Sequence, residues 1–186
     1  MRIAGGDWRG RALDAPPGRD TRPTSGRTRE AVFNILEHAP WAPDVEGLNV
    51  IDLFAGSGAL GLEALSRGAG FCLFVESAGP ALRALRANIQ ALGAGARTSV
   101  LARDVARLGP CPAGQGPFDL AFLDPPYARG LGEAALVALR DGGWLAPAAV
   151  VVFERGADEP APNVAGFEVL DERRYGAARV WFLSLG

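Results

Sequence analysis

The chain has 186 residues, 48% of them hydrophobic, and a formal net charge of −2. This is enough apolar surface for one ordinary domain with a modest appendage. No run approaches the roughly 18 apolar residues of a membrane span, and the first residues lack the long apolar core of a secretory signal. Its two cysteines exclude a disulfide framework and a cysteine metal cluster. We therefore expect a monomeric cytoplasmic protein without a membrane segment or a bound metal.

Residues 1–40 predict a small N-terminal extension. Two short segments, 1–4 and 8–13, flank a Gly-Gly-Asp turn and predict a β-hairpin. Prolines and a glycine then interrupt regular structure. A helix capped by Thr24 or Ser25 is expected to follow and to end near residue 37, with an apolar stripe on one side.

This extension is also strongly basic. Residues 1–29 hold seven arginines and three acidic residues, so the rest of the chain is acidic. Guanidinium groups bind phosphates in bidentate fashion and supply much of the affinity for nucleic acids, so we interpret the cluster as a nucleic-acid-contacting surface. A solvated arm is the alternative. The candidate nucleic-acid-binding residues are Arg9, Arg11, Arg22, Thr24, Arg27 and Arg29.

Residues 41–186 predict an α/β domain, because apolar strands alternate with helices and so indicate a parallel sheet with right-handed crossovers. The last two strands are joined by a short connection, which predicts an antiparallel hairpin at the edge of a seven-stranded, mostly parallel sheet. The predicted strands are 49–54, 71–76, 98–101, 118–123, 148–154, 167–173 and 177–185. The predicted helices are 58–67, 79–92 and 131–141, with a weaker turn of helix after residue 104.

The first strand of this domain leads into a glycine-rich loop. The sequence from Gly56 to Gly61 fits the G-x-G-x-x-G pattern, in which glycines let the backbone approach a nucleotide-like ligand. The match alone is weak, since a strand-to-helix turn without a ligand can have the same glycines. Asp52 beside the loop would repel a pyrophosphate but attract the ammonium and sulfonium groups of S-adenosylmethionine.

Two further acids follow the next two strands. Glu76 ends the second strand, where its carboxylate can accept hydrogen bonds from both ribose hydroxyls. Asp104 is placed to receive an adenine amino group, with the amide of Val105 near a ring nitrogen. Each acid could instead be a helix cap or a surface charge, but together they favour the adenosyl cofactor. The candidate cofactor-binding residues are Asp52, Phe54, Gly56, Ser57, Gly58, Glu76, Ser77, Asp104, Val105 and Asp124.

The fourth strand ends in Asp124, Pro125, Pro126 and Tyr127, the candidate catalytic residues. An exocyclic amine is a poor nucleophile because its lone pair is delocalised into the base. The Asp124 carboxylate and the Pro125 carbonyl could accept its two N–H bonds and localise that pair, on a turn that both prolines stiffen. Tyr127 could stack on an unpaired base. A capped Pro-rich turn with a packing tyrosine is the alternative.

These segments resemble the RsmD family, bacterial 16S rRNA (guanine-N2)-methyltransferases. The likeness covers the Asp-Pro-Pro-Tyr turn, residues 52–69, residues 2–11 and residues 22–34, and hence nearly the whole chain. The resemblance implies a Rossmann-like class I methyltransferase fold, with S-adenosylmethionine as donor and S-adenosylhomocysteine as product. It also implies a guanine of 16S rRNA as target, within an assembling small ribosomal subunit that carries ribosomal proteins.

The resemblance assigns Gly56, Ser57, Gly58, Glu76 and Asp104 to the cofactor and residues 124–127 to the target amine. The chain departs from the family at two places. Gly26 stands where the family often has Asp, and Ser77 and Ala78 follow Glu76 where a second acid is common.

Two other readings stay open at this stage. A DNA adenine-N6 methyltransferase would use the same Asp-Pro-Pro-Tyr turn, but no separate target-recognition domain fits in this length. An NAD-dependent oxidoreductase would use the glycine pattern, yet it leaves the turn unexplained.

Overall fold

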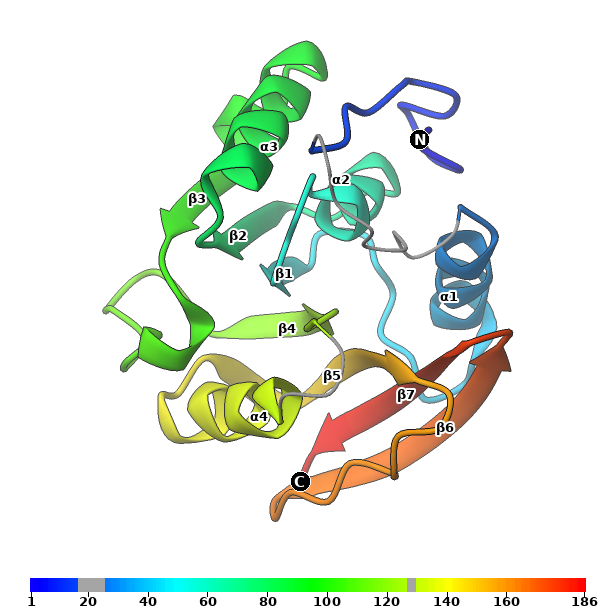
Figure 1. The fold of residues 1–186 in the computed structure, drawn as a ribbon, viewed down its shortest axis with the longest axis vertical. Helices are drawn as coiled ribbons and strands as arrows, with labels where there is room; N and C mark the ends of the chain where they lie inside the picture. Colours follow the sequence, from blue (N-terminus) through cyan, green and yellow to red (C-terminus); the bar gives the residue numbers. More distant parts are fainter. Residues whose placement is uncertain (17–25, 127–129) are drawn as a thin grey trace.

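A computed structural model of the chain describes residues 1–16, 26–126 and 130–186. Its centre is a seven-stranded sheet in the order β3-β2-β1-β4-β5-β7-β6, parallel except where β7 pairs with β5 and β6 (Figure 1). The predicted mostly parallel sheet with an antiparallel last hairpin is confirmed. The strands are β1 (Asn49–Leu53), β2 (Phe71–Glu76), β3 (Thr98–Ala102), β4 (Phe118–Leu123), β5 (Leu145–Gly156), β6 (Phe167–Tyr175) and β7 (Ala178–Leu185).

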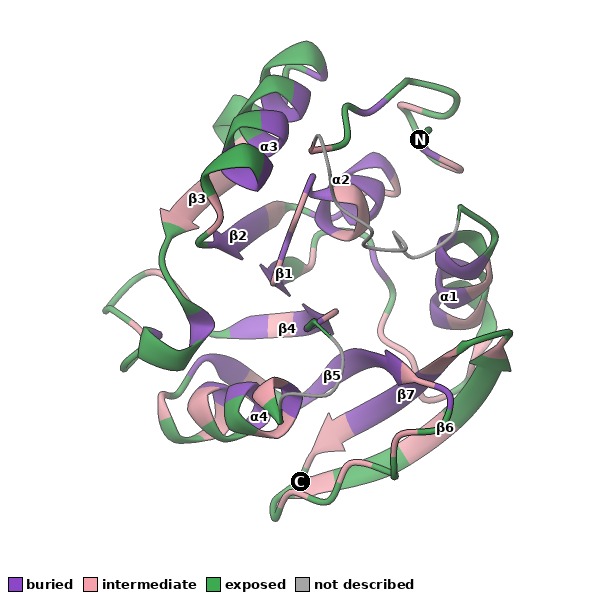
Figure 2. Cartoon of the chain, viewed as in Figure 1, coloured by how far each residue is buried: buried purple, intermediate pink, exposed green. Residues whose placement is uncertain are grey.

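Different helices cover the two faces of this sheet. Apolar residues of α1, α2 and α3 share one buried cluster with Phe74, Phe122 and Phe182. Residues of α4 share a second cluster with Leu123 and Phe153 on the opposite face. Figure 2 shows the central strands buried and β6 largely exposed at the sheet edge. The helices are α1 (Gly26–His38), α2 (Ala59–Ser66), α3 (Gly79–Ala91) and α4 (Leu131–Asp141), with short 3₁₀ turns η1 (Gly95–Arg97) and η2 (Val105–Arg107).

The chain order reverses beside β1. From β1 the chain continues outward through β2 and β3, and it then returns to place β4 on the other side of β1. In open α/β sheets, ligands bind outside the carboxyl ends of the strands at such a switch point. The topology therefore puts the loops after β1 and β4 at the expected ligand crevice.

Strand β5 begins three residues earlier than predicted. Leu145 already pairs with Phe118, and the ladder then shifts register before Leu120 pairs with Val150. Ala148 has a φ of 59° at this irregularity. A proline, here Pro147, is compatible with a strand at such a bulge, so it interrupts the ladder without ending the strand.

The N-terminal extension packs onto the domain rather than standing apart from it. The predicted hairpin is reduced to a single antiparallel bridge between Arg2 and Ala12, but Ile3 and Leu13 join the same buried cluster as α1 and the sheet. Helix α1 begins at Gly26 and has no acid in its first turn. This follows from the glycine at position 26, where the RsmD family often has Asp. The predicted caps Thr24 and Ser25 lie outside the described residues.

One buried carboxylate holds the extension in place. Glu63 of α2 is fully buried and accepts hydrogen bonds from the amides of Ala4 (2.9 Å) and Gly5 (2.8 Å) and from the guanidinium groups of Arg29 (3.2 Å) and Arg67 (2.9 Å). Arg29 also donates to the carbonyl of Arg2. The prediction that Arg29 contacts nucleic acid is therefore wrong, because its side chain is 1% exposed and its guanidinium is paired with Glu63 inside the protein.

None of the described helices is long and apolar enough to cross a membrane.

We predict that Glu63→Gln lowers the free energy of unfolding by about 3 kcal/mol, because it leaves the buried Arg29 without its counter-charge. Urea denaturation followed by circular dichroism measures this change. Glu30→Gln, an exposed carboxylate on α1, is the matched control and should change stability by less than about 0.5 kcal/mol. Equal destabilisation by the two variants would contradict the anchoring role of Glu63.

Candidate functional site

The carboxyl ends of β1, β2 and β4 bring the predicted site residues to one edge of the sheet. Leu53 is in register with Val75 on one side and with Leu123 on the other. The glycine loop, Glu76 and Asp124 follow these three residues directly. Positions far apart in sequence are thus neighbours at the switch point.

The glycine loop is a tight turn whose first two glycines have different surroundings. The amide of Gly58 donates to the carbonyl of Ala55 at 2.8 Å and closes the turn. A Cβ on Gly58 would lie 2.5 Å from Leu85, so packing against α3 excludes a side chain there. A Cβ on Gly56 would meet nothing closer than the carbonyl of Phe54 at 4.0 Å, so the space over Gly56 is open to a ligand.

Glu76 ties the end of β2 to this loop. Its carboxylate is buried and accepts from the amide of Gly56 at 2.8 Å and from the amides of Ser77 and Ala78 at 2.8 Å each. Ser77 and Ala78, where the sequence departs from the RsmD pattern, thus supply backbone donors to Glu76. These bonds preset the orientation of the carboxylate without help from a second acid.

Asp52 lies beneath the loop and is 2% exposed. Its carboxylate accepts from the amide of Gly61 at 3.0 Å. Burial raises the pKa of Asp52 well above its ordinary value; the Gly61 bond opposes this rise, while the charges of Asp124 and Glu76 add to it. The site therefore concentrates negative charge in a dry region, where a cationic ligand would be stabilised.

The candidate adenine-contacting residues lie at the end of β3. Asp104 is exposed and caps η2 by accepting from the amide of Ala106 at 2.9 Å, which is the capping alternative considered from the sequence. Val105 is buried in the apolar cluster on the α4 face. On the other side of the loop, Asn88 of α3 donates to the carbonyl of Ser57 at 3.0 Å. Sequence reasoning did not identify Asn88, whose only signal is an amide on the buried face of α3.

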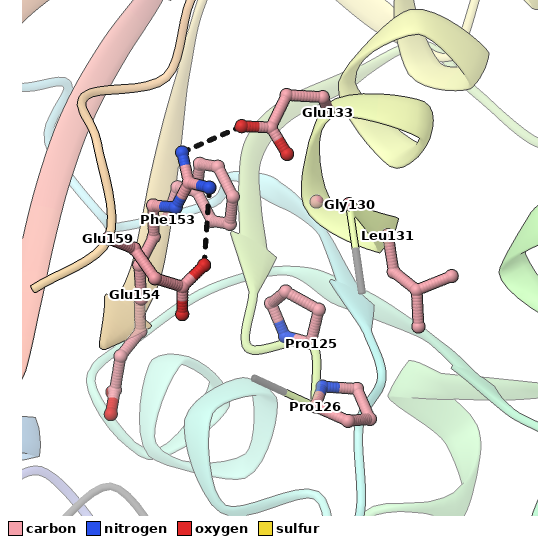
Figure 3. Close-up of a pocket in the computed structure, with 10 residues that line it drawn as sticks. Pro125, Pro126, Gly130, Leu131, Glu133, Phe153, Glu154 and Glu159 are labelled. Atoms are coloured by element: carbon pink, nitrogen blue, oxygen red, sulfur yellow. Dashed lines mark hydrogen bonds and ion pairs between the residues drawn. The ribbon is translucent and has the colours of Figure 1, made fainter. Parts of the chain in front are cut away.

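The Asp-Pro-Pro turn leaves β4 beside a small pocket. Asp124 is half-buried, Pro125 is buried and Pro126 is exposed. The prolines line a pocket that the start of α4 and the end of β5 complete (Figure 3). Tyr127 lies outside the described residues, so its predicted stacking stays a prediction.

An ion-pair cluster forms one wall of this pocket. Arg155 of β5 contacts Glu133 of α4 at 2.7 Å and Glu159 at 3.2 Å, and its guanidinium lies 5.2 Å from the centre of the Phe153 ring. Sequence reasoning did not find Arg155 or its neighbour Glu154. The sequence could have identified them only by their place near the end of the fifth strand, because that strand ends at the same sheet edge as the fourth.

The remaining basic residues of the extension are accessible where the structure describes them. Arg9 and Arg27 are exposed, and Arg11 donates to the carbonyl of Ala91 at 2.6 Å while remaining exposed. Trp8 packs under Arg97, whose guanidinium lies 5.1 Å from the ring centre. Arg22 and Thr24 lie outside the described residues.

A family model described as conserved hypothetical protein 95, which represents the RsmD family, matches residues 1–184. The chain belongs to the RsmD family. An Escherichia coli relative, ribosomal RNA small subunit methyltransferase D, is 40% identical over 165 residues, covering 88% of this chain and 79% of the relative. The Haemophilus influenzae protein of the same name is 34% identical over 177 residues, covering 95% of this chain and 89% of the relative.

Solved structures place this RsmD-family fold among the class I methyltransferases. The Escherichia coli protein yhhF has a TM-score of 0.84 at 34% identity, with 100% of this chain and 97% of that chain covered. Magnesium protoporphyrin IX methyltransferase from Synechocystis, solved with bound SAM, has a TM-score of 0.64 at 17% identity, with 86% and 79% covered. The second likeness concerns the fold alone.

We predict that Asp52→Asn stabilises the ligand-free RsmD-family protein at neutral pH. Because the folded-state pKa of Asp52 is raised, the folded protein holds this proton more tightly than the unfolded chain. The carboxyl therefore favours folding below its unfolded pKa of about 3.9, and this contribution is lost as the pH rises toward the raised value.

Urea unfolding between pH 4.5 and 8 tests this prediction. The stability advantage of Asp52→Asn over wild type should grow as the pH rises. Asp158→Asn, at an exposed position, is the control and should show no such trend. A stability difference for Asp52→Asn that does not change with pH would refute the argument.

Proposed function

We propose that this protein transfers a methyl group from S-adenosylmethionine to the exocyclic N2 amine of a guanine in 16S rRNA of the small ribosomal subunit. The observation that carries the proposal is the juxtaposition of the Asp124-Pro125 turn with the glycine loop at the switch point of the sheet. The names of the relatives from Escherichia coli and Haemophilus influenzae support small-subunit rRNA as the substrate. The two hydrogen-bond acceptors that Asp124 and Pro125 supply favour an amine as the group that receives the methyl.

The residues at the switch point fit S-adenosylmethionine. The open space over Gly56 admits a ligand against the backbone, and the buried Glu76 carboxylate presents acceptors to ribose hydroxyls. Asp52 and its acidic neighbours favour the positive charges of the amino acid part and the sulfonium. When bound, the cofactor supplies an electrophilic methyl group. Phe54, Ser57, Gly58, Ser77, Asp104 and Val105 complete the proposed cofactor site.

The catalytic part of the proposal assigns a task to each member of the turn. Asp124 accepts one N–H of the guanine amine, and the Pro125 carbonyl accepts the other, so that the lone pair is localised on the nitrogen and no longer delocalised into the ring. Neither proline has an amide hydrogen to compete for these acceptors. Pro126 stiffens the turn, and Tyr127 stacks on the base.

The extension supplies the proposed RNA contact. Arg9, Arg11 and Arg27 are exposed arginines of this surface, and Arg22 and Thr24 are proposed to extend it. The proposed partner is an assembling small subunit, with the enzyme acting as a monomer in the cytoplasm. In this division of labour, residues 1–40 contact RNA and residues 41–186 form the catalytic domain.

Adenine-N6 transfer is the second candidate. A Shewanella tRNA1(Val) (adenine(37)-N6)-methyltransferase is 34% identical over 87 residues, although these make up only 37% of that relative. An adenine amine could use the same two acceptors, so the target base has to be measured directly.

We predict that deleting the gene removes one N2-methylguanosine from 16S rRNA, because the proposed transfer to that amine would then be lost. Nuclease digestion and mass spectrometry of rRNA from deletion and parent strains measure the loss, and purified protein with S-adenosylmethionine should restore it on subunits from the deletion strain. Disappearance of an N6-methyladenosine would support the second candidate. Unchanged methylation of 16S rRNA would refute the proposed function.

We further predict that Asp124→Ala lowers the methyl-transfer rate by about 100-fold or more, the usual effect of removing one preorganised polar group from a transition state. S-adenosylmethionine affinity, measured by calorimetry, should change only a few-fold because Gly56 and Glu76 remain. Asp158→Ala is the control at an exposed site and should stay fully active. An active Asp124→Ala enzyme would defeat the two-acceptor mechanism.

A further inference from the structure

A second basic segment, residues 77–103, follows the end of β2. It contains four arginines and no acidic residue. Together with residues 1–29, it holds eleven of the 19 basic residues of the chain but only three of the 21 acids. The positive charge of this acidic protein is therefore concentrated in two segments, of which only the first has been considered so far.

Two of the four arginines in this segment are available to a ligand. Arg97 and Arg103 donate to main-chain carbonyls of the domain. Arg83 and Arg86 are exposed on α3, and neither is paired with an acid within the part of the chain that the structure describes. The positive charges of Arg83 and Arg86 thus face solvent.

Arg83 and Arg86 lie on one exposed stripe of α3. From Arg83 onward, the exposed positions of this helix are 83, 86, 87, 90 and 91, which is the spacing of a single helix face, and Figure 2 shows the outer side of α3 as exposed. The other members of the stripe are alanine, glutamine and alanine. At about 1.5 Å per residue, the stripe is about 12 Å long.

The first end of this stripe lies close to the candidate site. Helix α3 begins at Gly79, three residues after Glu76. A Cβ on Gly79 would lie 3.6 Å from Nη1 of Arg83, so the guanidinium of Arg83 reaches back to the first turn of the helix. The stripe therefore starts at the sheet edge where the glycine loop and Glu76 lie.

The second end of the stripe meets the N-terminal extension. Arg11 donates to the carbonyl of Ala91 at 2.6 Å and remains exposed. Beneath the stripe, the buried Asn88 accepts from the amide of Asp14 at 2.7 Å and donates to its carbonyl at 3.0 Å. The extension thus runs along α3, as Figure 1 shows, and its basic surface is continuous with the stripe.

We propose that Arg83 and Arg86 bind phosphates of the RNA substrate, so that the exposed stripe of α3 carries the RNA-contacting surface from the extension to the site. The inference rests on the proposed function, of which it uses only the RNA substrate. Guanidinium groups bind phosphates through charge and bidentate hydrogen bonds and need no apolar contact.

The composition of the stripe favours RNA over a protein partner. The core of a protein–protein interface is enriched in apolar and aromatic side chains. In the described residues the exposed large hydrophobic side chains are Met1, Val137 and Val169, and none of them belongs to α3. A face of arginine, glutamine and alanine offers donors and charge, which is what a phosphate backbone requires.

Binding of unmodified, protein-free 16S rRNA over a range of salt concentrations tests this surface. At about 0.1 M salt, the double variant Arg83→Gln/Arg86→Gln should bind the transcript roughly 10-fold or more weakly than wild type, because two phosphate contacts are lost. The slope of log Kd against log salt concentration should fall by about 1.4 to 1.8. The affinity for S-adenosylmethionine should stay at the wild-type value.

Two control variants separate a phosphate contact from other effects. Arg83→Lys/Arg86→Lys keeps both charges and should retain the salt slope, whereas a role in packing alone would leave the slope of the glutamine variant unchanged as well. Arg173→Gln/Arg174→Gln removes the same charge from β6, where both arginines pair with acids, and should bind like wild type. Equal weakening by the two glutamine double variants would overturn the inference.

The remaining outcomes distinguish this inference from its alternatives. If Arg83→Gln/Arg86→Gln binds free 16S rRNA like wild type but binds assembled subunits more weakly, the stripe contacts a ribosomal protein and the inference fails. Wild-type affinity and slope on both ligands would also overturn it. An enzyme that binds rRNA through these arginines but methylates no guanine amine would refute the proposed function and leave the role of α3 standing.

Discussion

The hydrogen bonds and ion pairs of the Glu63 carboxylate hold the N-terminal extension against the domain that carries the site, and the rest of the arrangement depends on them. Glu63 is fully buried in α2 and receives two backbone amides of the extension and the guanidinium groups of Arg29 and Arg67. Because α2 begins directly after the glycine loop, the same helix positions the loop at one end and the extension at the other. A buried ion pair of this kind stabilises little relative to an apolar core, but it is specific, since removing one partner leaves an unpaired charge.

Four acidic residues lie together at one edge of the sheet. Asp52, Glu76, Asp124 and Glu154 come from four neighbouring parallel strands and lie at or next to their carboxyl ends. Burial raises the pKa of Asp52, and the charges of Asp124 and Glu76 raise it further. In our proposal, a cationic cofactor balances the acids at β1 and β2, while the amine of the target base donates to Asp124 after β4. The same physical device would then serve both halves of the reaction.

The amino-acid pattern was sufficient to predict most of the fold and the location of the site. Alternation of apolar strands and helices predicted the seven strands, and the short connection before β7 predicted the antiparallel hairpin. These features are local or depend on chain length, which is why one sequence reveals them. The early start of β5 was missed because its bulge contains Pro147, a residue that usually argues against a strand.

By itself, the sequence determined the chemistry that is available: a glycine loop beside acids, and an acceptor turn stiffened by two prolines. Only the tertiary structure decided which charges can reach a ligand. Arg29 belongs to the same basic segment as Arg9 and Arg27, so the sequence does not distinguish them. In the structure Arg29 is buried and paired with Glu63, which lies 34 residues further along the chain. Glu154 has no motif around it, but the register of β4 and β5 places it next to Asp124. The reason is the same in both cases, because burial and neighbourhood depend on long-range packing that local residue patterns do not encode.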